Sequence, residues 1–169
     1  GYNIEGDLDP EKVVDDLIKN KVAAIANGRA EFSTRAYGNR SLIADVRHDV
    51  QGTVNRIKQR QQFRPFAPAI LEEHAEEYFS GPMNRWMQYC ATAKHDYKSV
   101  THVDGTGRVQ LVPKDCQSVF RQVIECYYEK TGVPMLLNTS LNIRGMPMVN
   151  DEQDAEEFEM KYGVNVWTS

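Results

Sequence analysis

The residues best suited to chemistry in this sequence are arginines, and they are concentrated in one segment. The net charge is −4, yet eight basic residues face three acidic ones between Arg29 and Arg64, while the rest of the chain holds twelve basic and twenty-one acidic residues. Seven of the eight are arginine, whose planar guanidinium donates paired hydrogen bonds to phosphate and carboxylate oxygens. An acidic protein with one basic segment is suited to a small anion in a pocket, because nucleic acid favours a more extended basic surface.

The stretch from Gly28 to Ser41 is the first candidate for an anion site. Arg29, Arg35 and Arg40 recur at five- and six-residue steps, with serines, a threonine and two glycines among them. Hydroxyls and free backbone amides beside arginines can complete a set of charge-assisted hydrogen bonds to phosphate. The pattern therefore indicates an ordered phosphate-binding loop, and the alternative is a solvated basic loop.

A second basic group follows in Lys58, Arg60 and Arg64. Arg56 and Arg60 are four residues apart and share a helical face, while Lys58 projects elsewhere. A lysine point charge beside arginine forks is suited to the oxygens of a triphosphate. The alternative is an exposed basic helix. The neighbouring aromatic residues, Phe63 and Phe66, are expected in the core rather than as a base-stacking platform.

Polar side chains in two later segments could complete such a site. They are His102, Asp104, Thr106, Arg108 and Gln110 in one segment, and Asn138, Thr139, Ser140 and Asn142 in the other. The second group directly follows an apolar strand, where α/β folds bind ligands. An ordinary turn and an ordinary cap are the alternatives. His102 and Asp104 alone do not make a metal site, so no metal ligand is assigned. No Walker loop, nucleophile elbow or dinucleotide-binding glycine motif occurs in the sequence.

Periodicity and capping signals predict the elements that position these residues. We expect helices over 9–21, 50–57, 115–132 and 151–161, and strands over 22–26, 66–71, 86–93, 108–112, 134–137 and 164–167. Pro68 should restrict its strand to a sheet edge or a bulge, and Arg121 should lie on a solvated helix face. Alternating helices and strands without repeats predict a single α/β domain with a mixed, twisted sheet flanked by helices.

Length and composition narrow the class of protein further. The 169 residues suit one domain, which we assign to 9–169, with 1–8 as a linker or boundary remnant. No apolar run approaches the roughly 20 residues that a membrane-spanning helix needs. The three cysteines show no C-x-x-C spacing, which favours a reducing, cytoplasmic location over a disulfide framework or a zinc site.

Four segments together resemble the carboxy-terminal, YrdC-like domain of the nodulation-type and antibiotic-modifying O-carbamoyltransferases. They are GRAEFSTRAYGNRSLIAD, NRIKQRQQFRPFAPAIL, HVDGTGRVQLV and TGVPMLLNTSLNIRGMPMV, in this order over residues 28–149. The resemblance implies a twisted α/β sheet with a basic cleft. It also implies that the domain forms carbamoyl adenylate from carbamoyl phosphate and ATP, and that an amino-terminal actin-like domain, absent from this sequence, passes the carbamoyl group to a hydroxyl.

By residue-level match, this resemblance implies a role for fourteen residues. Catalytic roles fall on Lys58, Arg60 and Arg64, and substrate or ATP binding falls on Arg29, Ser33, Arg35, Arg40, Ser41, His102, Asp104, Arg108, Asn138, Ser140 and Asn142. Magnesium is expected to bridge the ATP phosphates. One rival is a nucleotide- or RNA-binding module with a basic cleft, and another is a remnant that binds carbamoyl phosphate without reacting.

The sequence departs from the usual family pattern at four positions, Thr34, Tyr37, Leu141 and Met146. The family usually has proline, leucine, phenylalanine and glutamate there. The loss of glutamate at Met146 is expected to weaken contacts near the last motif. None of the departures removes an arginine of the basic segment, so we expect an active domain.

Overall fold

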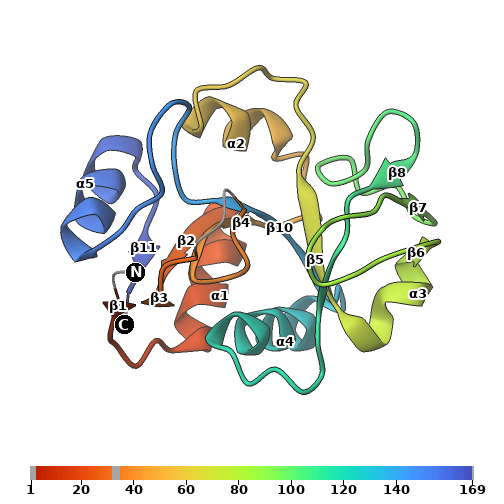
Figure 1. Cartoon of the computed structure of the whole chain (residues 1–169), viewed down its shortest axis with the longest axis horizontal. Helices are drawn as coiled ribbons and strands as arrows, with labels where there is room; N and C mark the ends of the chain where they lie inside the picture. The colour runs from red at the N-terminus through yellow and green to blue at the C-terminus, as the bar shows by residue number, and fades with distance from the viewer. Residues whose placement is uncertain (1–2, 32–34, 169) are drawn as a thin grey trace.

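A mixed six-stranded sheet forms the centre of the protein (Figure 1). The computed structural model describes residues 3–31 and 35–168. Across the sheet the order is β11 (Val166–Trp167), β2 (Val22–Ala26), β4 (Arg40–Ala44), β10 (Met135–Ser140), β5 (Ala67–Leu71) and β9 (Gln110–Val112). The four central strands pair antiparallel, and β11 and β9 join the two ends in parallel. The predicted α/β domain with a mixed sheet is therefore confirmed.

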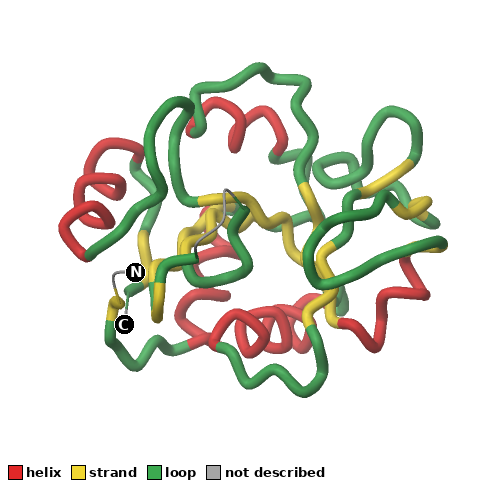
Figure 2. Tube along the Cα trace, in the orientation of Figure 1, coloured by secondary structure: helices red, strands yellow, loops and turns green. Residues whose placement is uncertain are grey.

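Two helices pack side by side against this sheet. They are α1 (Pro10–Asn20), which contacts β2, and α4 (Val119–Thr131), which contacts β10 and β5. Figure 2 shows long loops linking the remaining elements around the sheet. The remaining helices are α2 (Gln51–Ile57), η1 (Glu72–His74), α3 (Ala75–Tyr78) and α5 (Glu152–Tyr162). The remaining strands form a pair, β1 (Asn3–Ile4) and β3 (Gly28–Arg29), and a small sheet of β6 (Phe79–Ser80), β7 (Ala91–Ala93) and β8 (Thr106–Gly107).

Local capping residues set the ends of the long helices. Asp9 caps α1 by accepting a hydrogen bond from the Glu11 N–H, with Pro10 at the first helical position. Asp151 caps α5 by accepting from the Asp154 N–H. Gly132 ends α4 in the left-handed conformation, which costs glycine little. These three boundaries confirm the sequence prediction.

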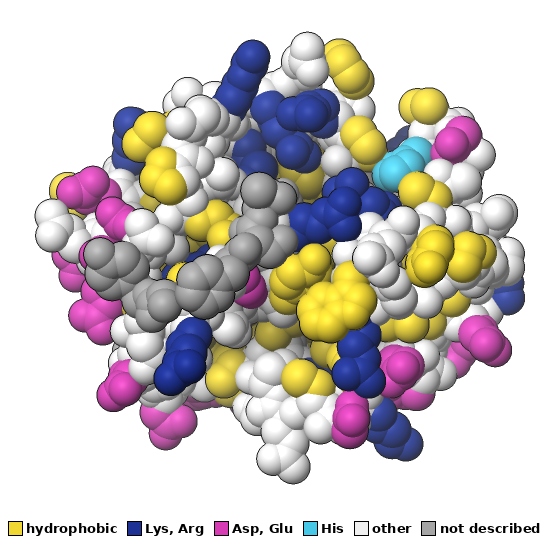
Figure 3. Space-filling view, in the orientation of Figure 1, with side chains coloured by type: hydrophobic (Ala, Val, Ile, Leu, Met, Phe, Trp, Pro, Cys, Tyr) yellow, Lys and Arg dark blue, Asp and Glu magenta, His cyan; other side chains and the backbone are white. Residues whose placement is uncertain are grey.

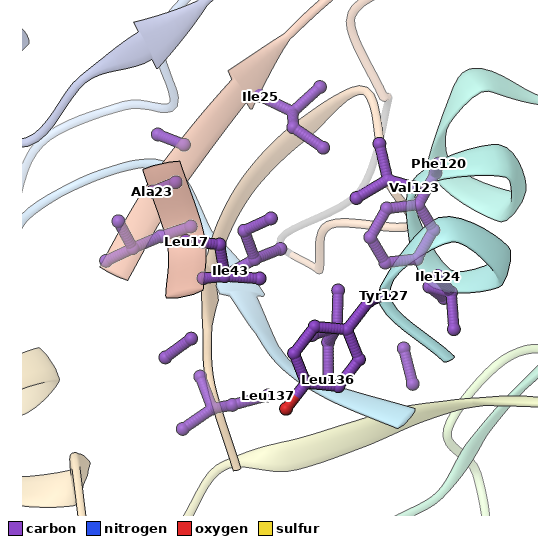
Figure 4. Packing of buried hydrophobic residues seen from close by; sticks show 14 of the residues in the cluster. Leu17, Ala23, Ile25, Ile43, Phe120, Val123, Ile124, Tyr127, Leu136 and Leu137 are labelled. Atoms are coloured by element: carbon purple, nitrogen blue, oxygen red, sulfur yellow. The ribbon is translucent and has the colours of Figure 1, made fainter. Parts of the chain in front are cut away.

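The core lies between α1, α4 and the sheet. Figure 4 shows Leu17 of α1 and Val123 and Ile124 of α4 packed with Ile43 and Leu137 of the sheet, and all five are fully buried. Each such side chain contributes about 1.5–3 kcal/mol by leaving water. This layer fixes the strands whose ends carry the polar side chains of the site.

A buried polar network sits within this core. The Tyr127 hydroxyl donates a hydrogen bond of 2.5 Å to Asp45 Oδ1, and Arg47 forms an ion pair of 2.7 Å with Asp45 Oδ2. Asp45 is fully buried, so these partners satisfy a charge that would otherwise be costly in the interior.

Several predicted elements differ from the observed ones. Pro68 lies within β5, an interior strand, and the edge prediction is wrong. β5 pairs with β9 only from Ala69 onward, so Pro68 has a paired neighbour in β10 alone. The strand predicted over 86–93 shrinks to β7, because the Asn84 side chain accepts hydrogen bonds from the Trp86 and Gln88 N–H groups and holds a turn. The strand predicted over 108–112 is observed only as β9, which begins at Gln110.

Three side chains also contradict their predicted environments. Ser118 caps α4, so the helix predicted to begin at residue 115 begins at Val119. Phe66 is buried as expected, but Phe63 is 76% exposed. Arg121 is 5% exposed rather than solvated, because it forms a 2.6 Å ion pair with Glu73 on η1.

Residues 3–8 pack against the domain. β1 pairs with β3, and the side chains of Ile4 and Leu8 are buried in the core. No helix within residues 3–31 and 35–168 is long and apolar enough to cross a membrane.

Candidate functional site

A small polar pocket forms where the loops around the sheet converge. We call it the arginine pocket; its volume is about 120 Å³, and it is lined by Arg35, Ala36, Arg60, Pro65, Phe66, Ala67, Met87, Arg108, Asn138, Thr139 and Ser140. Figure 3 shows that lysine and arginine side chains gather on this face of the molecule, while acidic side chains lie mostly around its lower and outer parts. Three arginines far apart in sequence thus meet in one pocket whose lining holds no acidic residue.

Arg60 is held in place by its surroundings. Its Nε donates a 2.7 Å hydrogen bond to Asn55 Oδ1, and one Nη2 N–H reaches the Pro65 carbonyl at 3.3 Å. The guanidinium lies 4.2 Å from the centre of the Phe66 ring, a favourable cation–π contact. A guanidinium has five N–H groups, so three of those on Arg60 make no hydrogen bond to any described residue. Arg60 is therefore a fixed donor with spare capacity on the pocket side.

Arg35 and Arg108 complete the positive lining. Arg35 Nη1 donates to the carbonyls of Trp86 and Met87, both at 2.9 Å. Arg108 is exposed, lines the pocket, and its side chain makes no hydrogen bond to the residues that the structure describes.

The arginine side chains repel one another. Burial, with the charges of Arg64 and Arg108, lowers the pKa of Arg60 to about 10. Burial and then the charge of Arg35 lower the pKa of Arg108. An anion between these side chains would relieve their repulsion, which favours binding of a multiply charged ligand.

Lys58 fixes the loop on the far side of the pocket. Its ammonium donates to the Asn142 carbonyl at 2.9 Å, to Asn142 Oδ1 at 3.0 Å and to the Ser140 carbonyl and hydroxyl. The Ser140 hydroxyl in turn donates to Asn142 Oδ1 at 2.6 Å. Burial and then Arg60 lower the pKa of Lys58 to about 7, whereas the surrounding oxygens favour its charged form. Lys58 thus connects α2 to the end of β10 and adds positive charge beside the pocket.

Asn138 offers a buried polar atom at the pocket. Its Nδ2 donates to the Ala36 carbonyl at 2.9 Å and to Gln110 Oε1 at 2.7 Å. Asn138 is only 2% exposed, and its buried Oδ1 has no hydrogen-bond partner among the described residues. An unpaired acceptor in a buried position costs stability unless a ligand or water satisfies it.

Arg40 and Ser41 lie outside the pocket lining. Arg40 is fully buried and donates to the backbone carbonyls of Asn27, Gly28, Asn39, Val149 and Asn150. It joins the start of β4 to the segment before α5. Burial lowers its pKa, against the charges of Glu31 and Asp151. Ser41 is paired with Ser140 in the sheet, and its buried hydroxyl has no partner among the described residues.

The remaining predicted residues lie near the pocket or farther away. Arg64 is exposed just beyond Arg60, and Arg29 is exposed on β3; neither lines the pocket. Asp104 accepts from the Thr106 N–H and hydroxyl and so forms a turn, while burial lowers the pKa of His102. Ser33 lies outside the described residues.

Some residues of the site carry no recognisable signal in the sequence. Asn55 orients Arg60, and Met87 completes the lining. Gln110, which orients Asn138, and Thr139, which also lines the pocket, belong to the two polar segments noted in the sequence. Phe66 was expected only as a core residue, yet its ring also supports the Arg60 guanidinium. No group of three potential metal-binding side chains exists within the part of the chain that the structure describes.

Two further cavities flank this site. One of about 140 Å³ lies between α5 and the segment 142–149 and includes Met146. The other, of about 370 Å³, lies between β9 and the segment around Trp86. The arginine pocket is thus the smallest of the three, and the one richest in arginine.

Comparison with known proteins relates the sequence to carbamoyltransferases. The family model of the carbamoyltransferase C-terminus matches residues 14–168. The chain is 41% identical over 138 residues to nodulation protein NolNO of Sinorhizobium fredii, covering 76% of this chain and 20% of that protein. It is 36% identical over 149 residues to nodulation protein NolO of Bradyrhizobium diazoefficiens, covering 82% and 27%. The chain therefore spans less than a third of the length of these relatives.

Solved structures show a related fold. Full-length HypF in a phosphate- and nucleotide-bound form matches 96% of this chain and 21% of its own, with a TM-score of 0.64 and 20% identity. HypF of T. kodakarensis matches 99% of this chain and 21% of its own, with a TM-score of 0.63 and 19% identity. At this identity the likeness shows the fold alone.

Proposed function

Because this chain belongs to the family of carbamoyltransferase carboxy-terminal domains, we propose that its arginine pocket binds carbamoyl phosphate and the phosphates of ATP and that the domain forms carbamoyl adenylate. The single observation that carries this proposal is the set of Arg35, Arg60 and Arg108 in one pocket without acidic residues. HypF, which shares the fold, has been crystallised with phosphate and nucleotide bound, and this supports the same class of ligand here.

The atoms of this reaction balance with one water molecule. Water cleaves the phosphate from carbamoyl phosphate and leaves inorganic phosphate and carbamate. A carbamate oxygen then attacks the α-phosphorus of ATP, a new oxygen–phosphorus bond forms, and the bond to the β-phosphate oxygen breaks. Pyrophosphate departs with the electron pair. The negative charge on the transferred phosphoryl oxygens needs stabilisation throughout, and fixed cationic donors supply it.

We assign different roles in this reaction to residues in and beside the pocket. Arg60, already held by Asn55 and Phe66, presents its unused N–H groups to phosphate oxygens without further ordering. Arg35 and Arg108 neutralise charge on either side. Lys58 holds Ser140 and Asn142 in place, and the Asn138 Oδ1 acceptor suits the carbamoyl N–H group.

Magnesium would accompany ATP and be held chiefly by its phosphates. The lining of the arginine pocket includes no carboxylate, and a magnesium ion prefers oxygen ligands. These residues therefore fit the phosphate oxygens better than they fit the ion, which supplies charge neutralisation when bound.

The experiment is phosphorus NMR of this chain with ATP, magnesium and carbamoyl phosphate. We expect inorganic phosphate, pyrophosphate and a new adenylate resonance to appear together, and pyrophosphate to be absent when carbamoyl phosphate is omitted. Nucleotide binding without pyrophosphate would contradict the adenylation proposal and favour a binding module.

Transfer to a hydroxyl acceptor is assigned to a partner domain of the actin-like class. The charged residues that line the arginine pocket are all arginines, which suit an anion. This chain alone should therefore form the adenylate and not carbamoylate a hydroxyl compound. Efficient transfer by the isolated chain would show that both half-reactions occur in this domain.

A further inference from the structure

The largest cavity beside the site has an aromatic lining. We call it the aromatic pocket; it has a volume of about 370 Å³ and is lined by Tyr37, Arg85, Trp86, Gln110, Leu111, Val112, Pro113, Asp115, Cys116, Ser118 and Phe120. Small-molecule sites typically have about 300–1,000 Å³. The arginine pocket, at about 120 Å³, has room for phosphate groups but not for a whole nucleotide.

The two pockets share a wall. Tyr37 and Trp86 line the aromatic pocket, and their chain neighbours Ala36 and Met87 line the arginine pocket. Arg35 crosses this wall, because its Nη1 binds the carbonyls of both Trp86 and Met87. The two pockets are therefore adjacent, and Arg35 binds the segment that lies between them.

A second hydrogen bond joins the pockets at the sheet. Asn138, which lines the arginine pocket, donates from Nδ2 to Oε1 of Gln110, which lines the aromatic pocket, at 2.7 Å. Hydrogen bonds of Arg35 and of the Asn138–Gln110 pair therefore both connect residues of the two pockets.

The lining of the aromatic pocket suits a flat ring. Trp86 is 55% exposed, and its ring meets Tyr37 edge to face at a centroid distance of 5.6 Å. A largely exposed tryptophan offers a face on which a nucleobase can stack. Arg85 and Asp115 are 3.9 Å apart at this pocket and largely exposed, and they offer polar partners for ribose hydroxyls.

We propose that the aromatic pocket binds the nucleobase of the nucleotide whose phosphates lie in the arginine pocket, with Trp86 as the stacking platform. This inference rests on the proposed function, since it assumes that the arginine pocket binds nucleotide phosphates. Trp86 is then a determinant of nucleotide affinity, and it has no part in binding carbamoyl phosphate.

The test compares ligands with and without a base. Calorimetry measures the dissociation constants of ATP, inorganic tripolyphosphate and carbamoyl phosphate for the wild type, Trp86→Leu and Tyr89→Leu. Tyr89 is the matched control, because it is 49% exposed and lines neither pocket. Loss of one stacking contact should raise the dissociation constant of ATP about ten-fold or more for Trp86→Leu. Tripolyphosphate and carbamoyl phosphate should bind unchanged.

Tryptophan fluorescence gives a second readout. The chain has two tryptophans, and Trp167→Phe leaves Trp86 as the sole emitter. Trp167 donates from Nε1 to Asp16 at 2.9 Å, away from both pockets. In this background ATP should quench the emission, and tripolyphosphate should not.

Different failures have different meanings. If the wild type binds neither ATP nor tripolyphosphate, the proposed function fails and this inference fails with it. If ATP binds and pyrophosphate forms, but Trp86→Leu binds ATP like the wild type, only the aromatic pocket is wrongly assigned. An equal loss of tripolyphosphate affinity in Trp86→Leu would also overturn it, because Trp86 would then act through the wall that Arg35 holds.

Discussion

Replacing Arg60 with lysine is the most direct test of the arginine pocket. The change keeps the positive charge but removes the Nε hydrogen bond of 2.7 Å to Asn55 and the flat contact 4.2 Å from the Phe66 ring centre. It also removes the paired N–H groups that suit phosphate oxygens. The reaction rate should therefore fall although the net charge of the pocket is conserved.

The structure sets the size of both effects of this substitution. Loss of one preorganised charge-stabilising donor lowers the rate about 10²–10³-fold, which corresponds to about 3–4 kcal/mol in the activation barrier. Loss of a hydrogen bond that involves a charged group, together with the cation–π contact, lowers the free energy of unfolding by about 2–3 kcal/mol. For a domain of this size that corresponds to a melting temperature lower by about 4–12 °C, so the variant should remain folded at 25 °C.

The assay is pyrophosphate release at saturating ATP and carbamoyl phosphate, with thermal melts in parallel. Arg56→Lys is the matched control, since Arg56 is exposed in the last turn of α2, four residues before Arg60, and lines none of the three cavities. Asn55→Ala should give an intermediate rate, because Arg60 keeps its guanidinium and loses one support. Equal rates for Arg60→Lys and Arg56→Lys would refute the reasoning and make Arg60 a structural residue.

Three further substitutions test other parts of the structure. Arg64→Lys should lower the rate much less than Arg60→Lys, because Arg64 is exposed and does not line the pocket; an equal loss would extend the site to Arg64. Asp45→Asn should lower the free energy of unfolding by about 2–3 kcal/mol near neutral pH. Burial opposes the charge of Asp45, but hydrogen bonds from Arg47 and Tyr127 lower its pKa. The stability that the charged Asp45 contributes is therefore present at a pH above the usual pKa of a carboxyl group, and it is lost as the pH falls through the pKa of Asp45 in the folded protein. Urea melts of wild type and variant should therefore converge in acid. Gly38→Ala should destabilise more than Gly105→Ala, because both glycines have positive φ but only at Gly38 would the new Cβ lie 2.4 Å from Phe120; equal melting temperatures would contradict that packing.

The sequence by itself determined the elements whose signals are local. The Asp9-Pro10 pair, the Asp151 cap and Gly132 act on backbone groups within a few residues, so their effect does not depend on the rest of the fold. The apolar run of β2 and the stripe of α4 identify buried faces in the same way. The excess of arginine between residues 29 and 64 predicts an anion site, because residue type alone sets what a guanidinium can bind.

Tertiary structure decided which of those arginines meet. Arg35, Arg60 and Arg108 line one pocket, while Arg40 turns to the backbone carbonyl of Val149, 109 residues away. Arg121 likewise finds Glu73 across 48 residues and leaves the solvent. The partner of a long side chain depends on which distant segments the fold brings within about 3 Å, and no spacing along the chain encodes that distance.

The same reason explains Pro68 and Trp86. Whether Pro68 can lie inside a sheet depends on where β9 begins to pair with β5. Trp86 lines a cavity in a segment whose backbone is bound at the Trp86 carbonyl by Arg35, 51 residues away. Residue type limits the chemistry that each side chain can perform. Contacts between segments far apart in sequence decide where that chemistry is assembled.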